Sequence, residues 1–232
     1  MTDGNDEPAF RRSVSEMLAL VVHDLRNPVA TISANVSFVR EEGAEALQGD
    51  SDLVEALDDV DLAMNDLMRG LEQLAWIARW IGGSKPVEAA GGDVRQAVES
   101  ALHRIEKTVP VTYADVLGET KYGGAPLSRT VELLVRNSLQ HDARGTPRVD
   151  VRREEDVVII EVRDAGRAVG ADLREHVFDL DGQQVIKSRP DGRYSRALGL
   201  LAARALADGL HATLEAGGTD GDAWFRLRVP AR

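Results

Sequence analysis

A heptad repeat near the N-terminus constrains the fold of this chain more than any other feature. Apolar residues recur at alternating spacings of four and three, which places them along one stripe of a helix. The first run comprises Leu18, Val22, Leu25, Val29, Ile32, Val36 and Val39. The second run comprises Leu57, Val60, Met64, Leu67, Leu71, Leu74, Ala78 and Ile81. The repeat therefore predicts an antiparallel hairpin of two long helices joined over 43–52, with Ser51 or Asp52 as the cap of the second helix.

The predicted hairpin carries more apolar surface than two helices can bury against each other. Further apolar residues widen both stripes: Val14, Met17, Val21, Val54, Met68 and Ile77. A two-helix unit with such wide faces typically pairs into a four-helix bundle. We therefore expect the hairpin to form a homodimer.

Charge and composition exclude several classes of protein. A net charge of −11 over 232 residues argues against a nucleic-acid partner, because neutralising phosphates requires clustered Lys and Arg. The chain has no cysteine, which rules out disulfides, thiolate metal sites and cysteine nucleophiles. No apolar run approaches the roughly 20 residues that span a bilayer, and the acidic N-terminus is unlike the basic start of a signal peptide. We therefore expect a cytoplasmic protein without membrane insertion.

One histidine lies just past the apolar stripe, at a position that should project from the flank of the helix. His23 is followed by Asp24, Arg26, Asn27 and Pro28. A proline inside a helix costs about 3 kcal/mol because it removes a hydrogen bond to the carbonyl four residues back, here that of Asp24. An imidazole is a competent nucleophile, and an adjacent carboxylate can hold its tautomer. An isolated histidine here would be an ordinary surface residue, so the interpretation depends on its neighbours.

The six residues from His23 to Pro28 resemble the H-box of sensor histidine kinases, which lies on the first helix of their dimerisation and phosphotransfer domain. The resemblance implies that His23 is the phosphoacceptor and that Asp24 is the base that polarises its imidazole. It also implies that Asn27 occupies the position that orients water for dephosphorylation.

Below His23, the first helix carries mostly small residues. The residues on this face are Arg26, Ala30, Ser33, Ala34 and Ser37, and no charged residue occurs from Asn27 to Val39. Solvated helix faces are usually richer in Lys and Glu. We therefore expect this face to dock a partner domain.

Beyond the hairpin the periodicity changes, which indicates a second domain of mixed helices and strands. The predicted helices cover 93–107, 126–141 and 195–208, and the predicted strands cover 148–153, 157–163, 212–216 and 223–229. The sequence thus predicts an α+β chain: a helical hairpin that forms a dimeric four-helix bundle over 9–82, a linker over 83–92, and an α/β sandwich over 93–232.

Motifs of this second domain resemble, in order, those of the ATP-binding domain of the histidine kinase, gyrase and Hsp90 group, the GHKL domain. Asn137 to His141 matches the N-box, in which an asparagine holds Mg²⁺ against the phosphates. Asp164 and Gly166 resemble the first glycine box, whose aspartate accepts a hydrogen bond from the adenine amino group.

Two further motifs complete the resemblance to the GHKL domain. Phe178 fits the short F-box, and the stretch from Leu198 to Ala203 resembles the helix start after the second glycine box. The resemblance implies a nucleotide site composed of Asn137, His141, Asp164, Gly166 and Gly199, with Asn137 as the metal ligand.

Departures from the GHKL pattern gather at the phosphate end of the implied site. Ala168 replaces a glycine of the first box, and Ser195 and Ala197 replace two of the three glycines of the second. Leu133 replaces an earlier asparagine of the N-box, and Arg167 a common proline. Glycines let backbone amides approach phosphates closely, so we expect ATP and Mg²⁺ to bind weakly or not at all.

These expectations favour a histidine phosphotransferase of a two-component phosphorelay, which passes a phosphoryl group between receiver-domain aspartates through His23. One alternative is an ATP-dependent, autophosphorylating histidine kinase with a divergent nucleotide site. Another is a non-enzymatic scaffold, against which the retention of His23, Asp24 and Asn27 counts. Because the first helix begins soon after Met1, we expect no sensor domain ahead of it and an input that comes from a protein. The expected partners are response-regulator receiver domains, with an upstream hybrid kinase as a candidate donor.

Overall fold

The computed structural model describes residues 6–43, 47, 50–83, 91–105, 107–141, 145–188 and 198–232. The chain divides into two compact units, Met1–Gly83 and Ser84–Arg232.

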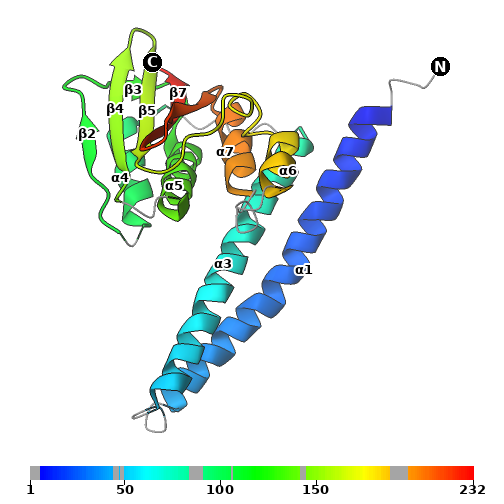
Figure 1. Cartoon of the computed structure of the whole chain (residues 1–232). Helices are drawn as coiled ribbons and strands as arrows, with labels where there is room; N and C mark the ends of the chain where they lie inside the picture. The colour runs from blue at the N-terminus through cyan, green and yellow to red at the C-terminus, as the bar shows by residue number, and fades with distance from the viewer. Residues whose placement is uncertain are drawn as a thin grey trace. The chain divides into compact units, whose positions relative to one another are not determined.

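The first unit is an antiparallel hairpin of two long helices, α1 (Asp6–Glu42) and α3 (Ser51–Ile81) (Figure 1). The N-cap of α3 is Asp50, whose carboxylate accepts a hydrogen bond from the amide of Leu53 at 3.1 Å. The predicted caps, Ser51 and Asp52, were therefore wrong, because the chain enters the helix one residue earlier. Near the connection, Arg40 of α1 forms ion pairs with two carboxylates of α3, Asp58 at 2.9 Å and Asp61 at 2.7 Å.

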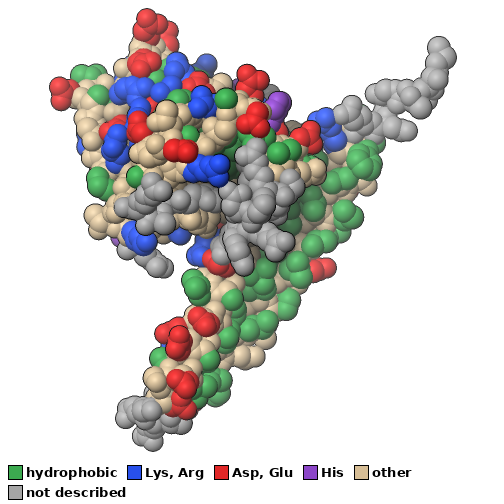
Figure 2. Space-filling model, in the orientation of Figure 1, with side chains coloured by type: hydrophobic (Ala, Val, Ile, Leu, Met, Phe, Trp, Pro, Cys, Tyr) green, Lys and Arg blue, Asp and Glu red, His purple; other side chains and the backbone are tan. Residues whose placement is uncertain are grey.

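The apolar stripes of the hairpin divide into a buried seam and an exposed seam. Val22, Val29, Met64 and Leu71 form the buried core between the helices, with Val36, Met68, Leu74 and Ala75 packed against it. The alternate members of the repeat stay exposed: Leu25, Ile32 and Val39 on α1, and Val60 and Leu67 on α3. Figure 2 shows apolar side chains along both helices on the visible face. A single hairpin thus buries only part of the heptad repeat.

The second unit is built on a mixed β-sheet with the strand order β2-β4-β5-β7-β6. Its strands are β2 (Val111–Tyr113), β4 (Arg148–Glu154), β5 (Val157–Asp164), β6 (Thr213–Thr219) and β7 (Asp222–Pro230). Strand β2 pairs with β4 in parallel, whereas the other neighbours are antiparallel. A small second sheet pairs β1 (Gly92–Asp93) with β3 (Glu119–Thr120).

Helices cover one face of the main sheet, as an α/β sandwich requires (Figure 1). The helices of this unit are α4 (Val94–His103), α5 (Gly124–His141), α6 (Leu180–Ser188) and α7 (Leu198–Gly209). Asp93, the first residue of the predicted helix over 93–107, is the N-cap of α4. Its carboxylate accepts hydrogen bonds from the amides of Arg95 and Gln96. The predicted α/β fold is confirmed, and its strands lie where the sequence placed them to within a few residues. The sequence did not predict β1, β2, β3 or α6.

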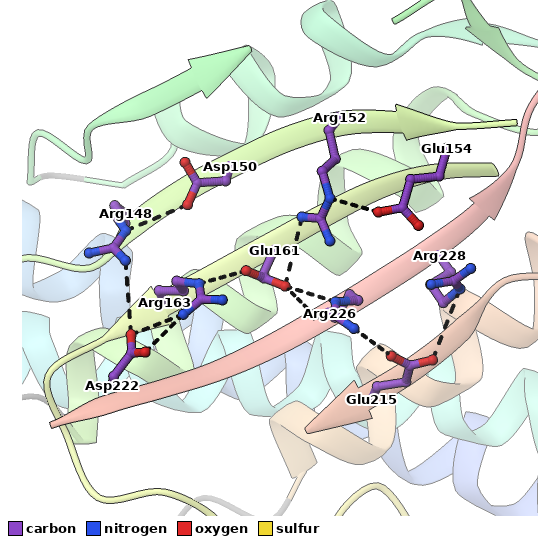
Figure 3. A network of polar contacts seen from close by, with 10 residues as sticks. All are labelled: Arg148, Asp150, Arg152, Glu154, Glu161, Arg163, Glu215, Asp222, Arg226 and Arg228. Atoms are coloured by element: carbon purple, nitrogen blue, oxygen red, sulfur yellow. Dashed lines mark hydrogen bonds and ion pairs between the residues drawn. The ribbon is translucent and has the colours of Figure 1, made fainter. Parts of the chain in front are cut away.

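The opposite face of the sheet is covered by arginine and carboxylate side chains instead of helices (Figure 3). Glu161 lies at the centre of this network, with its side chain only 3% exposed. It accepts hydrogen bonds from Arg163 at 2.6 Å and Arg226 at 2.8 Å. Burial acts to raise the pKa of Glu161, but the hydrogen bonds from Arg226 and Arg163 outweigh it and hold the pKa below its ordinary value. Arg152, Glu215 and Asp222 extend the network across four strands.

We predict that Glu161→Gln destabilises the second unit by about 2 kcal/mol, because it removes a charge that two arginines bind. The depressed pKa makes this contribution present above the ordinary glutamate pKa and lost as the pH falls through the folded-state value. The gap in unfolding free energy between wild type and variant should therefore narrow in acid. Urea unfolding at several pH values measures it. Glu154→Gln, at a half-exposed partner of Arg152, is the matched control, and an equal loss in both variants would contradict the assignment.

Candidate functional site

The packing of α1 turns His23 into solvent. Val22 is buried against α3, and the next residue of a helix points about 100° away from it. The side chains of His23 and Asp24 are 73% and 78% exposed, and Nδ1 of His23 lies 3.2 Å from Oδ1 of Asp24. The predicted flank position of His23 is therefore what the structure has. The carboxylate engages Nδ1, which leaves Nε2 as the ring nitrogen that faces away from it.

The helix below His23 continues through the proline of the motif. Pro28 lies inside α1, which runs on to Glu42. Because Pro28 has no N–H, the carbonyl of Asp24 receives no helical hydrogen bond from it. Asn27 is exposed and lies one turn below His23. Its backbone carbonyl accepts a hydrogen bond from the hydroxyl of Thr31 at 3.1 Å.

In the second unit, a buried ionic cluster holds the helix that carries Asn137. Glu132 of α5 has a side chain 8% exposed and accepts from Arg104 at 2.6 Å, Arg129 at 2.9 Å and Arg136 at 2.9 Å. Burial acts to raise the pKa of Glu132, but hydrogen bonds from these arginines lower it below its ordinary value. Arg104 follows α4, so the cluster joins α4 to α5 and fixes the rotation of α5.

Asn137 is half-buried on α5, whereas Leu133 at the earlier N-box position belongs to the core. The side chain of His141 lies outside the described residues. Among the described residues, no group of three His, Asp or Glu side chains is arranged to hold a metal ion. Mg²⁺ at Asn137 would therefore take most of its oxygen ligands from nucleotide phosphates and water, as this ion commonly does.

Asp164 ends β5 and is largely buried, at 9% exposure. Its Oδ1 accepts a hydrogen bond from the amide of Gly166 at 2.9 Å. The loop that follows is tied to the turn between β6 and β7: Gly221 donates to the carbonyl of Gly166 at 2.9 Å, and Ala168 donates to the carboxylate of Asp220 at 3.0 Å. The sequence did not single out Asp220 or Gly221. An Asp-Gly pair between two predicted strands signals a turn, but not the loop that the turn contacts.

The remaining predicted motif residues have different surroundings. Phe178 is buried and makes an edge-on contact with Phe225 of β7, with ring centroids 6.0 Å apart, so it belongs to the core. Gly199 lies in the first turn of α7, where an added Cβ would meet nothing within 4 Å. Ser195 and Ala197 lie outside the described residues. Helix α5 packs against α7 and β5, so Asn137, Asp164 and Gly199 come from adjoining elements.

Part of the chain matches a known protein family. Residues 124–232 match the family described as histidine kinase-, DNA gyrase B-, and HSP90-like ATPase. This segment begins with α5 and includes β4 to β7, and thus contains every residue of the implied nucleotide site.

Curated relatives resemble a larger part of the chain. The sensor histidine kinase MtrB of Mycobacterium tuberculosis is 27% identical over 98% of this chain and 40% of its own length. The signal transduction histidine-protein kinase AfsQ2 of Streptomyces coelicolor is 28% identical over 97% of this chain and 42% of its own length. The alginate biosynthesis sensor protein KinB of Pseudomonas aeruginosa is 24% identical over 76% of this chain and 31% of its own length. The chain thus spans less than half the length of these relatives.

Solved structures share the fold. Full-length ShkA in complex with AMPPNP superposes with a TM-score of 0.68 at 19% identity, covering 94% of this chain and 46% of that one. The histidine kinase AdeS of Acinetobacter baumannii superposes with a TM-score of 0.57 at 16% identity, covering 90% of this chain and 98% of that one.

No described helix of the present chain is both long enough and apolar enough to cross a membrane.

Proposed function

Because the chain belongs to the histidine kinase-like two-component proteins and carries an ATPase domain of the GHKL type, we propose that it transfers the γ-phosphoryl group of ATP to His23 and then to a receiver-domain aspartate. One observation carries the proposal: the exposed His23–Asp24 pair lies on the same chain as the ATPase domain. The comparisons thus favour the kinase over the phosphotransferase that the missing glycines had suggested.

The geometry at His23 suits attack on phosphorus. When Nδ1–H donates its hydrogen bond to Asp24, the lone pair of Nε2 is available as the nucleophile. Nε2 forms the P–N bond while the P–O bond to the leaving ADP breaks, and the carboxylate stabilises the positive charge that develops on the ring. When a receiver aspartate attacks the phosphorus, the P–N bond breaks and the neutral imidazole returns. Neither step requires Asp24 to take the proton completely.

The ATPase domain would bind the substrate through residues at two ends. Asp164 is a buried carboxylate whose Oδ1 is held by Gly166, which leaves Oδ2 as an acceptor for the adenine amino group. Asn137 would contribute a side-chain oxygen to a Mg²⁺ ion that neutralises phosphate charge. ShkA, which shares this fold, was crystallised with AMPPNP, and this supports ATP as the nucleotide.

A second candidate function is the phosphotransferase, which would take its phosphoryl group from a receiver instead of from ATP. It is favoured by the phosphate end of the site. The side chain of Leu133 lies in the core and has no polar atom, and the amide of Ala168 already donates to Asp220.

We predict that the chain incubated with γ-labelled ATP and Mg²⁺ becomes labelled at His23, and that His23→Ala removes the label completely because no other group is the acceptor. His176→Ala, at another exposed histidine, is the control and should retain full labelling. Labelling from a phosphorylated receiver but not from ATP would establish the phosphotransferase instead. Label that survives in His23→Ala would contradict both functions.

The exposed seam of the hairpin supports a dimer in this function. Leu25, Ile32, Val60 and Leu67 repeat at seven-residue intervals on each helix and remain exposed. In the heptad geometry they lie on the same side of the hairpin, away from the flank that carries His23. A second copy that presents the same stripe would bury all of them in a four-helix bundle.

We predict that Leu25→Glu raises the dissociation constant of the dimer on the order of 100-fold or more, because it buries a charge in an apolar interface. Leu20→Glu is the matched control: Leu20 is more exposed than Leu25 but lies off the repeat. Light scattering across a dilution series should report a monomer for the first variant and a dimer for the second. A wild-type chain that stays monomeric at micromolar concentration would refute the dimer.

The face below His23 is proposed as the receiver-docking surface. Arg26, Ala30, Ala34 and Ser37 are all exposed and lie on the His23 side of α1. Phosphotransfer requires the receiver aspartate to come in line with Nε2, so a protein surface must approach closely here. Small side chains permit that approach.

We predict that Ala30→Glu and Ala34→Arg lower the rate of transfer to the receiver at least roughly tenfold, since bulk and charge hold the receiver away. Labelling of His23 by ATP and the dimer should be unaffected. Asn35→Glu, next to Ala34 but turned about 100° from it, is the control. Phosphotransfer to a purified receiver, quenched at successive times, measures the rates. Normal rates in both variants would place docking elsewhere.

A further inference from the structure

The segment from Ala165 to Asp179, which links β5 to α6, contacts the hairpin of β6 and β7 at several points. Near its start lie the hydrogen bonds of Gly166 and Ala168 to the turn. In the middle, Arg174 donates to the carbonyl of Gly218 at 2.8 Å. At the end, the ring of Phe178 packs edge-on against β7. The conformation of this segment is thus coupled to that of the turn.

The coupling reaches Asp164 through Gly166. The amide of Gly166 donates to Oδ1 of Asp164, and its carbonyl accepts from the amide of Gly221, both at 2.9 Å. Gly166 is therefore held on both sides, and the orientation of the Asp164 carboxylate follows from that of Gly166. Asp220 holds Ala168, two residues further on, at 3.0 Å.

The turn does not need the side chain of Asp220 for its own shape. Its reversal depends on Gly221, with φ of +89°, and on Gly218, with φ of +99°, a region that favours glycine. A Cβ on Gly218 would also lie 2.1 Å from the carbonyl oxygen of Asp222. Among the described residues, the carboxylate of Asp220 contacts the amide of Ala168 and takes no part in the strand pairing.

We propose that Asp220 is a positioning residue for the nucleotide site. By holding Ala168 while Gly221 holds Gly166, it keeps the loop in the arrangement that fixes Oδ1 of Asp164 and presents Oδ2 to the adenine. The inference rests on the proposed binding of ATP and adds to it a residue outside the nucleotide-binding motifs. The group that Asp220 binds is the backbone amide of Ala168, which a glycine at this position would also supply.

The test compares three variants of the full chain by calorimetry with ATP and with ADP. Asp220→Ala should weaken both nucleotides by the same factor, about tenfold, because the loosened loop displaces the Asp164 carboxylate, which binds the adenine that ATP and ADP share. Asp220→Asn should bind near the wild-type affinity, since its carbonyl oxygen can still accept from Ala168. Asp156→Ala removes an exposed aspartate from the turn between β4 and β5 and should change nothing.

A second readout needs no nucleotide. Hydrogen exchange of the Gly166 and Ala168 amides should be faster in Asp220→Ala than in wild type and restored in Asp220→Asn. Unchanged exchange, or wild-type affinity in Asp220→Ala, overturns the positioning role, as does a loss confined to ATP. A wild-type chain that binds neither nucleotide refutes the proposed function itself. That result is distinct from one in which wild type and Asp220→Ala bind the nucleotides equally well.

Discussion

The burial of Val22, Val29, Met64 and Leu71 between α1 and α3 fixes the rotation of both helices about their axes. Because neighbouring residues of a helix point about 100° apart, this one seam turns His23 outward and places Asp24 beside it. The same rotation leaves Leu25 and its heptad relatives exposed on another side. The acceptor, the surface for a second copy and the small-residue face for a receiver are thus consequences of a single packing arrangement.

In the second unit, two buried carboxylates have the corresponding role. Glu132 joins α4 to α5 through three arginines and thereby orients the helix of Asn137. Glu161 binds arginines across the outer face of the sheet, which no described helix covers. Removing one partner of such a cluster leaves a charge unpaired, which is more costly than the cluster's net contribution to stability. These clusters hold in place the elements that the nucleotide site depends on.

The sequence predicted the long helices best, because a heptad repeat sustained over many turns fits few structures besides a pair of packed helices. It failed on β1, β2 and β3, which are two or three residues long and depend on partners distant in the chain. The apolar pattern also could not tell the buried Val22 from the exposed Leu25, since both fit the stripe. Only packing against α3 distinguishes them. The Asp220–Ala168 bond joins residues 52 positions apart, and no local pattern signals it. The missing glycines led the sequence to favour a phosphotransferase, whereas the relatives favour a kinase.

At the centre of the proposed mechanism, the chain uses ATP to phosphorylate His23 through Nε2, while Asp24 holds Nδ1. Phosphorus-31 and nitrogen-15 NMR of the chain labelled at histidine nitrogens, after incubation with ATP and Mg²⁺, tests this most directly. We expect one phosphohistidine signal with phosphorus coupled to Nε2 of His23. Phosphorus on Nδ1, on another residue, or absent altogether would contradict the mechanism.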